Sequence, residues 1–206
     1  MKRIRIFSII LLTIVFFTVT LNAFDSKFAE NITPVQAYNM LKTVPNTYLV
    51  DVRTQYEYQL IGHPVGAYNF PFMFLTSEFA VKGATYANGK KAPKTRYQFV
   101  LNRNFLKELK KKFKSSDNLI FMCRSTKRSH KAADLAYKAG FKNSYNLLGG
   151  FEGYRFTGKI KGEKALVRKY STIYGKPGYI NGWKYYGLPY NYTMDPKYIY
   201  PPDLKK

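Results

Sequence analysis

The chain of 206 residues has only one cysteine and two histidines. Because a disulfide within one chain needs two cysteines, no intramolecular disulfide can hold this fold together. His63 and His130 stand in no spacing that is typical of a metal site. We therefore expect no metal and no other cofactor. The length is sufficient for one domain that is stabilised by a sizeable hydrophobic core.

The one long apolar run lies at the N-terminus. Three basic residues within positions 1–5 precede the apolar stretch 6–21, and a polar residue and a small residue follow at 22–23. This pattern is typical of a secretory signal, and the run is shorter than the about 20 residues of a membrane helix. We expect residues 1–23 to be a signal peptide, either cleaved or kept as an uncleaved membrane anchor. The folded part is then exported, for example to a periplasm.

Acidic residues are scarce, with 12 Asp and Glu against 34 Lys and Arg, so the formal net charge is +22. In a cytoplasmic protein this charge would suggest nucleic acid, but the export signal argues against a nucleic-acid partner. Two interpretations remain open: attraction to small anions or a membrane surface, and a solvated lysine-rich surface. The run 107–114 fits the second interpretation. There Phe105, Leu109 and Phe113 form one apolar helix face with the charges opposite.

Local signals mark where helices begin and end. Thr33 and Pro34 are typical of an N-cap and a first helical position. Thr54 and Glu57 have the spacing of a capping box, which indicates the start of a second helix. Gly140 is typical of a helix end.

Helix and strand patterns alternate through the middle of the chain. The expected helices cover about 34–43, 54–60, 104–114, 129–139 and 151–155, and the expected strands cover 48–52, 67–70, 119–122 and 144–148. Residues 72–79 are interpreted as a helical turn, and 82–96 as a polar loop. The alternation predicts an α/β fold with a mostly parallel central sheet that helices cover on both faces.

Cys123 directly follows the apolar strand 119–122 and precedes a helix that begins near Ser129. Functional sites of parallel sheets lie at the carboxyl ends of strands, where Asp51 also falls, so we expect Asp51 and Cys123 to be neighbours. A thiol acts as a nucleophile only as the thiolate, which helix N-termini and cations stabilise. The loop 123–128 can therefore hold a thiolate, an oxyanion or a persulfide among its backbone N–H groups.

Several blocks of residues occur in a recognisable order. They are Asp51-Val52-Arg53 with Glu57-Tyr58, Gly62-His63 with Gly66-Ala67, the loop CRSTKRS from Cys123, and Leu148-Gly149-Gly150-Phe151. The ordered set resembles a rhodanese-homology domain over about residues 30–156. The resemblance implies a rhodanese-like three-layer α/β fold for residues 24–156.

The resemblance also implies a sulfurtransferase of the thiosulfate sulfurtransferase type. Cys123 would be the catalytic residue, taking sulfur from an anionic donor such as thiosulfate and passing it from a persulfide to a thiol or to cyanide. The binding loop would comprise Arg124, Ser125, Thr126, Lys127 and Arg128, with Arg124 and Arg128 attracting the donor. Asp51 and Arg53 would support the loop, although a purely structural ion pair is an equal alternative.

Two alternatives stay open. Related phosphatases and arsenate reductases have five residues between Cys and Arg, whereas four separate Cys123 from Arg128, which favours sulfur over phosphate. The family usually has glycine where Thr126 stands. If this position needs a positive φ, a β-branched residue is penalised there. The chain would then be a weak enzyme or a non-catalytic binding module.

Residues 157–206 differ in composition from the rest, with nine tyrosines, six glycines, five prolines and the only tryptophan, Trp183. The blocks 181–184 and 187–189 resemble an extension of exported bacterial rhodanese-like proteins. We expect an irregular extension that packs on the domain; a lid over the site and a subunit contact are the alternatives.

Overall fold

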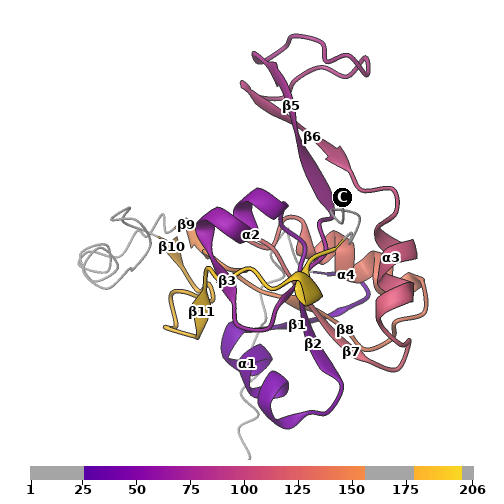
Figure 1. Cartoon of the computed structure of the whole chain (residues 1–206), viewed down its shortest axis with the longest axis vertical. Helices are drawn as coiled ribbons and strands as arrows, with labels where there is room; N and C mark the ends of the chain where they lie inside the picture. Colours follow the sequence, from indigo (N-terminus) through magenta and orange to yellow (C-terminus); the bar gives the residue numbers. More distant parts are fainter. Residues whose placement is uncertain (1–25, 156–178, 201–206) are drawn as a thin grey trace, which may run out of the picture.

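The computed structural model describes residues 26–155 and 179–200 (Figure 1). The expected signal segment 1–23 lies outside the described residues, as do residue 156 and residues 157–178 and 201–206 of the expected extension. Within the described ranges, no helix is both long enough and apolar enough to cross a membrane.

A five-stranded sheet with the strand order β1-β8-β7-β2-β4 forms the centre of the fold, and all its strand pairs are parallel. Helices connect these strands, as parallel pairing requires. The strands are β1 (Glu30–Ile32), β2 (Thr47–Asp51), β4 (Tyr68–Asn69), β7 (Asn118–Met122) and β8 (Ser144–Leu147). The predicted α/β fold with a central parallel sheet is confirmed.

Helices cover both faces of this sheet (Figure 1). Because successive residues of a strand point to opposite faces, β7 places Leu119 and Phe121 in one buried cluster with α3 and α4. Its Ile120 and Met122 lie in the other cluster, with α1 and α2. The helices are α1 (Pro34–Thr43), α2 (Gln55–Ile61), α3 (Phe105–Lys112), α4 (Ser129–Lys138) and the short 3-10 helix η1 (Pro196–Tyr198).

The predicted helix starts are confirmed. Thr33 and Thr54 are the N-caps of α1 and α2, and each hydroxyl accepts a hydrogen bond from the backbone N–H three residues on. Glu57 completes the predicted box at α2 by accepting a hydrogen bond from the Thr54 N–H at 3.1 Å.

The expected helical turn at 72–79 is wrong. These residues form β5 (Met73–Ala80), which pairs antiparallel with β6 (Arg96–Leu101) in a hairpin that projects from the domain (Figure 1). A small buried cluster of Ala80, Tyr86 and Ala92 packs the distal part of this hairpin. The pairing partner lies beyond a long loop, so the local pattern of β5 alone did not indicate a strand.

The expected helix at 151–155 is also wrong. Residues 149–152 form a turn, and β9 (Tyr154–Arg155) then pairs antiparallel with β10 (Tyr179–Ile180). Gly149, Gly150 and Gly153 have φ values of 74°, 62° and 100°, which a right-handed helix does not use. The partner strand lies in the C-terminal extension, far along the chain.

Within the described part of the extension, Trp183, Leu188 and Ile199 pack on the α1 and α2 side of the sheet, whereas Tyr200 packs on the other side against Phe70. Trp183 is 2% exposed, lies edge-on to Tyr38, and donates a hydrogen bond from Nε1 to the Pro189 carbonyl at 2.9 Å. In addition, β11 (Tyr190–Asn191) pairs with β3 (His63–Pro64). These contacts join the extension to the end of α2.

Replacing Trp183 with Ala should lower the free energy of unfolding by about 3–5 kcal/mol, because it removes a large buried ring and its hydrogen bond. Tyr185→Ala, at a neighbouring ring that is 38% exposed, should change it by less than about 1 kcal/mol. Urea denaturation followed by circular dichroism measures both. Equal, small effects would show that the extension does not pack on the domain in solution.

Candidate active site

Cys123 stands at the carboxyl end of β7, one residue after Met122, whose register partner on β2 is Asp51. Asp51 and Cys123 therefore lie at the ends of neighbouring strands, as expected. The cysteine is 1% exposed and lies against a cavity of about 290 Å³. The lining of this cavity is Glu57, Met73, Arg96, Phe99, Cys123, Arg124, Ser125, Lys127 and Arg128.

The loop that follows Cys123 curves back to the start of α4. At that point the backbone N–H of Arg128 donates a hydrogen bond to the Cys123 Sγ at 3.4 Å. A backbone donor at a helix N-terminus stabilises negative charge on sulfur. The predicted arrangement of strand, thiol, short loop and helix is present.

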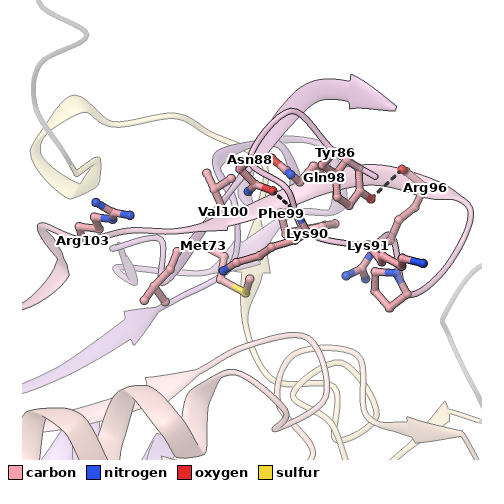
Figure 2. Close-up of a pocket in the computed structure, with 12 residues that line it drawn as sticks. Met73, Tyr86, Asn88, Lys90, Lys91, Arg96, Gln98, Phe99, Val100 and Arg103 are labelled. Carbon is pink, nitrogen blue, oxygen red and sulfur yellow. Dashed lines mark hydrogen bonds between the residues drawn. The ribbon is translucent and has the colours of Figure 1, made fainter. Parts of the chain in front are cut away.

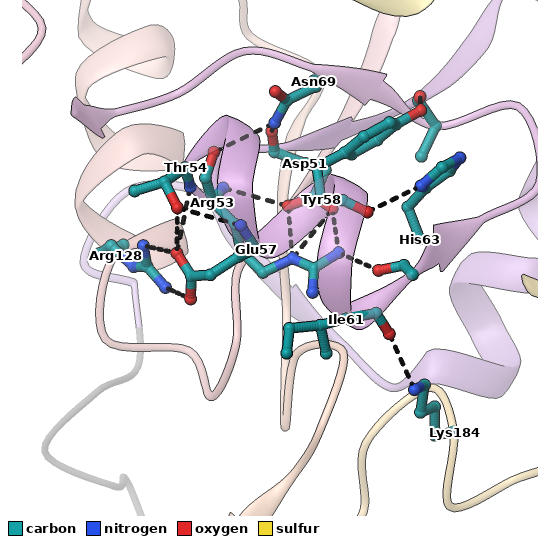
Figure 3. Close-up of polar contacts among 12 residues, drawn as sticks. Asp51, Arg53, Thr54, Glu57, Tyr58, Ile61, His63, Asn69, Arg128 and Lys184 are labelled. Carbon is teal, nitrogen blue, oxygen red and sulfur yellow. Dashed lines mark hydrogen bonds and ion pairs between the residues drawn. The ribbon is translucent and has the colours of Figure 1, made fainter. Parts of the chain in front are cut away.

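The Arg128 side chain is held by Glu57 (Figure 3). Its two terminal nitrogens donate to the two carboxylate oxygens of Glu57 at 2.7 and 2.6 Å. Burial raises the pKa of Glu57, but the hydrogen bonds and charge of Arg128 outweigh that effect and lower the pKa to about 2. Burial in turn lowers the pKa of Arg128, and Glu57 more than compensates, so that pKa lies above its ordinary value.

Arg124 has a carboxylate partner as well. Its Nε donates to Glu152 at 2.9 Å, and its Nη2 donates to the hydroxyl of Tyr179 at 3.1 Å. The arginine is about half exposed, so this ion pair is screened by solvent. Both arginines that were expected to attract an anionic donor are thus balanced by acidic residues.

A glycine turn holds the beginning of the loop. The backbone N–H groups of Phe151 and Glu152 donate to the carbonyls of Cys123 and Arg124 at 2.8 and 3.0 Å. Gly150 lies so close to the loop that a Cβ there would overlap the Cys123 carbonyl oxygen, so this contact requires glycine. Gly149 has a different constraint, because a Cβ there would overlap the Asn181 carbonyl oxygen of the extension.

Thr126 has a φ of 73°, which lies in the left-handed region. Backbone strain was expected at this β-branched residue if its φ were positive, and that condition is met. Its side chain is buried, and its hydroxyl accepts a hydrogen bond from the Gly149 N–H at 2.9 Å and is joined to the Tyr154 hydroxyl at 2.8 Å. The Thr126 carbonyl accepts from the Ser129 hydroxyl at 3.2 Å. These bonds offset the backbone strain.

Asp51 and Arg53 form a completely buried ion pair of 2.6 Å beneath the site (Figure 3). Arg53 also donates to the Gly62 carbonyl at 2.7 Å and lies 4.3 Å over the ring of Phe151. Because the Phe151 N–H binds the Cys123 carbonyl, Arg53 contacts the loop through this ring. The pair is therefore placed where a supporting role is possible.

Of the predicted loop residues, Cys123, Arg124, Ser125, Lys127 and Arg128 line one cavity, and Thr126 lies buried behind it. The sequence prediction did not include the following residues, which also contribute to the site: Glu57, Met73, Arg96, Phe99, Glu152 and Tyr154. Glu57 had been identified as a helix-capping residue and as part of one block of the family resemblance, with no role in the site. Met73, Arg96 and Phe99 come from the β5–β6 hairpin. Nothing in the sequence indicated that they belong to the site, because the hairpin strands were not predicted.

The two histidines have other positions. His63 is buried, with its ring stacked 3.6 Å from that of Tyr58, and His130 contacts the Thr126 carbonyl at 3.0 Å through Nδ1. Within the described residues, no three His, Cys, Asp or Glu side chains are grouped in a way that could hold a metal ion.

Comparison with known proteins adds a family. Residues 33–156 match the family described as the rhodanese-like domain. An uncharacterised protein of Rickettsia prowazekii is 33% identical over 124 residues, which are 60% of this chain and 85% of that protein. A chloroplastic thiosulfate sulfurtransferase of Arabidopsis thaliana is 29% identical over 134 residues, which are 65% of this chain and 93% of that protein.

A solved structure has a similar fold. The crystal structure of the M. tuberculosis protein Rv0390 superposes with a TM-score of 0.53 at 29% sequence identity. The match covers 81% of this chain and 99% of that one.

The ion pair of Glu57 predicts a pH dependence of stability. Because the pKa of Glu57 in the folded state is depressed from 4.5 to about 2, its stabilisation is present above pH 4.5 and is lost as the pH falls toward 2. Wild type should lose about 3 kcal/mol of unfolding free energy more than Glu57→Gln over that interval. Urea denaturation at a series of pH values measures this, with Glu108→Gln as the control, since Glu108 pairs with the exposed Lys111. Parallel pH profiles for wild type and Glu57→Gln would contradict the prediction.

The hydroxyl of Thr126 should matter more than its branching. Thr126→Val keeps the shape but removes one of the two hydroxyl acceptors of the Gly149 N–H, the other being Tyr154 at 3.0 Å, and it also removes the Thr126 partner of the Tyr154 hydroxyl. The variant should lower the unfolding free energy by about 0.5–1.5 kcal/mol. Thr126→Ser keeps the hydroxyl and should be close to wild type. Thermal or urea unfolding of the two variants tests this. A Val variant as stable as the Ser variant would show that the hydroxyl does not compensate the strain.

Proposed function

The chain belongs to the rhodanese-like domain family, and from that premise we propose that it is a sulfurtransferase that carries sulfane sulfur as a persulfide on Cys123. The observation that carries the proposal is the position of Cys123. Its Sγ accepts the Arg128 N–H at the start of α4 and lies against a cavity of about 290 Å³. A cavity of this size suits a small sulfur anion such as thiosulfate.

The proposed reaction has two displacement steps. In the first, the Cys123 thiolate attacks the outer sulfur of thiosulfate, and a new S–S bond forms. The bond between the two thiosulfate sulfurs breaks, and sulfite leaves with the electron pair. In the second, a thiolate or cyanide attacks the outer sulfur of the persulfide, and Cys123 leaves as a thiolate. Electrons balance without an added oxidant.

The length of the loop supports sulfur over phosphate. Four residues separate Cys123 from Arg128, and the Arg128 side chain is engaged by both oxygens of Glu57. In this arrangement the arginine is not aimed at a tetrahedral phosphate, and the backbone N–H is the donor that faces the sulfur. The partners of the reaction are then a small anionic sulfur donor and a thiol acceptor.

The location of the reaction is part of the proposal. The basic and apolar pattern of residues 1–23 supports export, with membrane contact only through this segment if it is not cleaved. No nucleic-acid partner is proposed.

Incubation of the full chain with thiosulfate or polysulfide should add one sulfur atom to the intact mass, and cyanide should remove it. Cys123→Ser should gain none, and because the chain has no other cysteine this comparison is free of competing thiols. Intact mass spectrometry is the measurement, with circular dichroism to establish that the variant is folded. Absence of the gain in wild type, or the same gain in Cys123→Ser, would contradict the proposal.

A non-catalytic binding module is the second candidate, and the φ of 73° at Thr126 is the observation that favours it. A strained or altered loop would bind but not turn over. If wild type transfers no sulfur and Thr126→Gly does, this second function replaces the first.

A further inference from the structure

The β5–β6 hairpin contains a second cavity, of about 490 Å³ (Figure 2). It lies beside the cysteine cavity, because Met73, Arg96 and Phe99 line both. Cys123 is absent from its lining. A group bound in this second cavity would therefore lie next to the cysteine cavity without replacing the donor at the thiol.

The lining of the hairpin cavity has one sign of charge. Lys90, Lys91, Arg96 and Arg103 line it, and no Asp or Glu does. Within the described residues none of these four cations forms an ion pair with a carboxylate. This differs from the cysteine loop, where both arginines have acidic partners. A cleft lined by charges of one sign concentrates ions of the opposite sign.

Neutral donors and a defined backbone complete the cavity. Gln98 is 6% exposed, and its side-chain Nε2 is buried without a hydrogen-bond partner among the described residues. Gln98 is a lining residue of the cavity and adds a polar, uncharged side chain to its wall. A hydrogen bond from the Tyr86 N–H to the Lys90 carbonyl at 2.9 Å closes the turn that carries the lysines. In Figure 2 the Lys90 side chain extends toward Met73, which the two cavities share.

We propose that this cavity binds the anionic body of the sulfur acceptor, a small thiol that carries two or more carboxylates. The inference rests on the proposed sulfurtransferase function and adds a substrate class to it. The two cavities together have a volume typical of sites for small organic molecules, whereas thiosulfate alone needs only the smaller one. The arginines and lysines match carboxylate geometry and charge.

The transfer step follows from this placement. The carboxylates lie among the hairpin cations, and the acceptor thiolate reaches across Met73 and Phe99 to the outer sulfur of the Cys123 persulfide. A bond forms between the acceptor sulfur and the outer sulfur, the bond to Sγ breaks, and Cys123 retains the electron pair as a thiolate. The acceptor leaves as a persulfide.

The binding experiment does not depend on sulfur transfer. The full chain is titrated with tricarballylate, a tricarboxylate without a thiol, and amide chemical shifts of residues 86–101 are followed by NMR. Lys90→Ala/Lys91→Ala should weaken binding at least fivefold. The matched control is Lys82→Ala/Lys94→Ala, which removes the same charge from exposed residues of the same hairpin outside the cavity, and should change the Kd by less than twofold.

A second titration uses thiosulfate, because the hairpin cations could also bind an inorganic oxyanion. If thiosulfate shifts the 86–101 amides as strongly as tricarballylate, the cavity is a donor site and the acceptor assignment is overturned. If the control variant weakens tricarballylate binding as much as the cavity variant, the effect is one of net charge and the site is refuted.

The kinetic experiment compares mercaptosuccinate, with two carboxylates, and the neutral 2-mercaptoethanol as acceptors. Lys90→Ala/Lys91→Ala should raise the KM for mercaptosuccinate at least fivefold and leave that for 2-mercaptoethanol within twofold. An equal change for both acceptors overturns the proposal. Specific tricarballylate binding in a chain that never gains sulfur would instead refute the sulfurtransferase function while the anion site stands.

Discussion

The paired contacts of Arg128 are the constraint on which the site depends. Its backbone N–H binds the Cys123 sulfur, and its side chain is fixed by both oxygens of Glu57 at the start of α2. Glu57 in turn caps that helix through Thr54. One residue therefore couples the thiol, the loop and a helix from the opposite face of the sheet. A partly buried charge pair of this kind keeps its geometry because loss of either partner would leave a poorly solvated charge without its partner.

This coupling has an electrostatic consequence. With Arg128 and Arg124 both paired to carboxylates, these two arginines add little net positive charge at the sulfur. In the proposed reaction the backbone N–H stabilises the thiolate locally, and Lys90 and Lys91, which line only the hairpin cavity, attract the anion. Substitutions at these two lysines leave the lining of the cysteine cavity unchanged, whereas Met73, Arg96 and Phe99 belong to both cavities.

The sequence predicted well those features that depend on neighbouring residues. The caps at Thr33 and Thr54 and the apolar run before Cys123 are local, and the structure has each of them. The parallel sheet and the closeness of Asp51 to Cys123 were predicted from the general behaviour of such sheets, but other features that need a distant partner were missed. β5 pairs with β6 across a long loop, and the turn after Gly149 leads into a strand whose partner is in the extension. Glu57 was identified by its local role, but its second role requires Arg128, which is 71 residues away.

Thr126 shows how a side chain can substitute for the conformational freedom of glycine. A β-branched residue at a φ of 73° is strained by about 1–2 kcal/mol, an amount comparable to one or two buried hydrogen bonds. The Thr126 hydroxyl makes such bonds, to the Gly149 N–H and to Tyr154. Glycine at this position would remove the strain but also these side-chain bonds, and the loop would keep its backbone bonds from Phe151 and Glu152 to the Cys123 and Arg124 carbonyls. The Thr126 hydroxyl therefore adds a side-chain link between the loop 123–128 and the segment 149–154. This link makes the loop more rigid than glycine would.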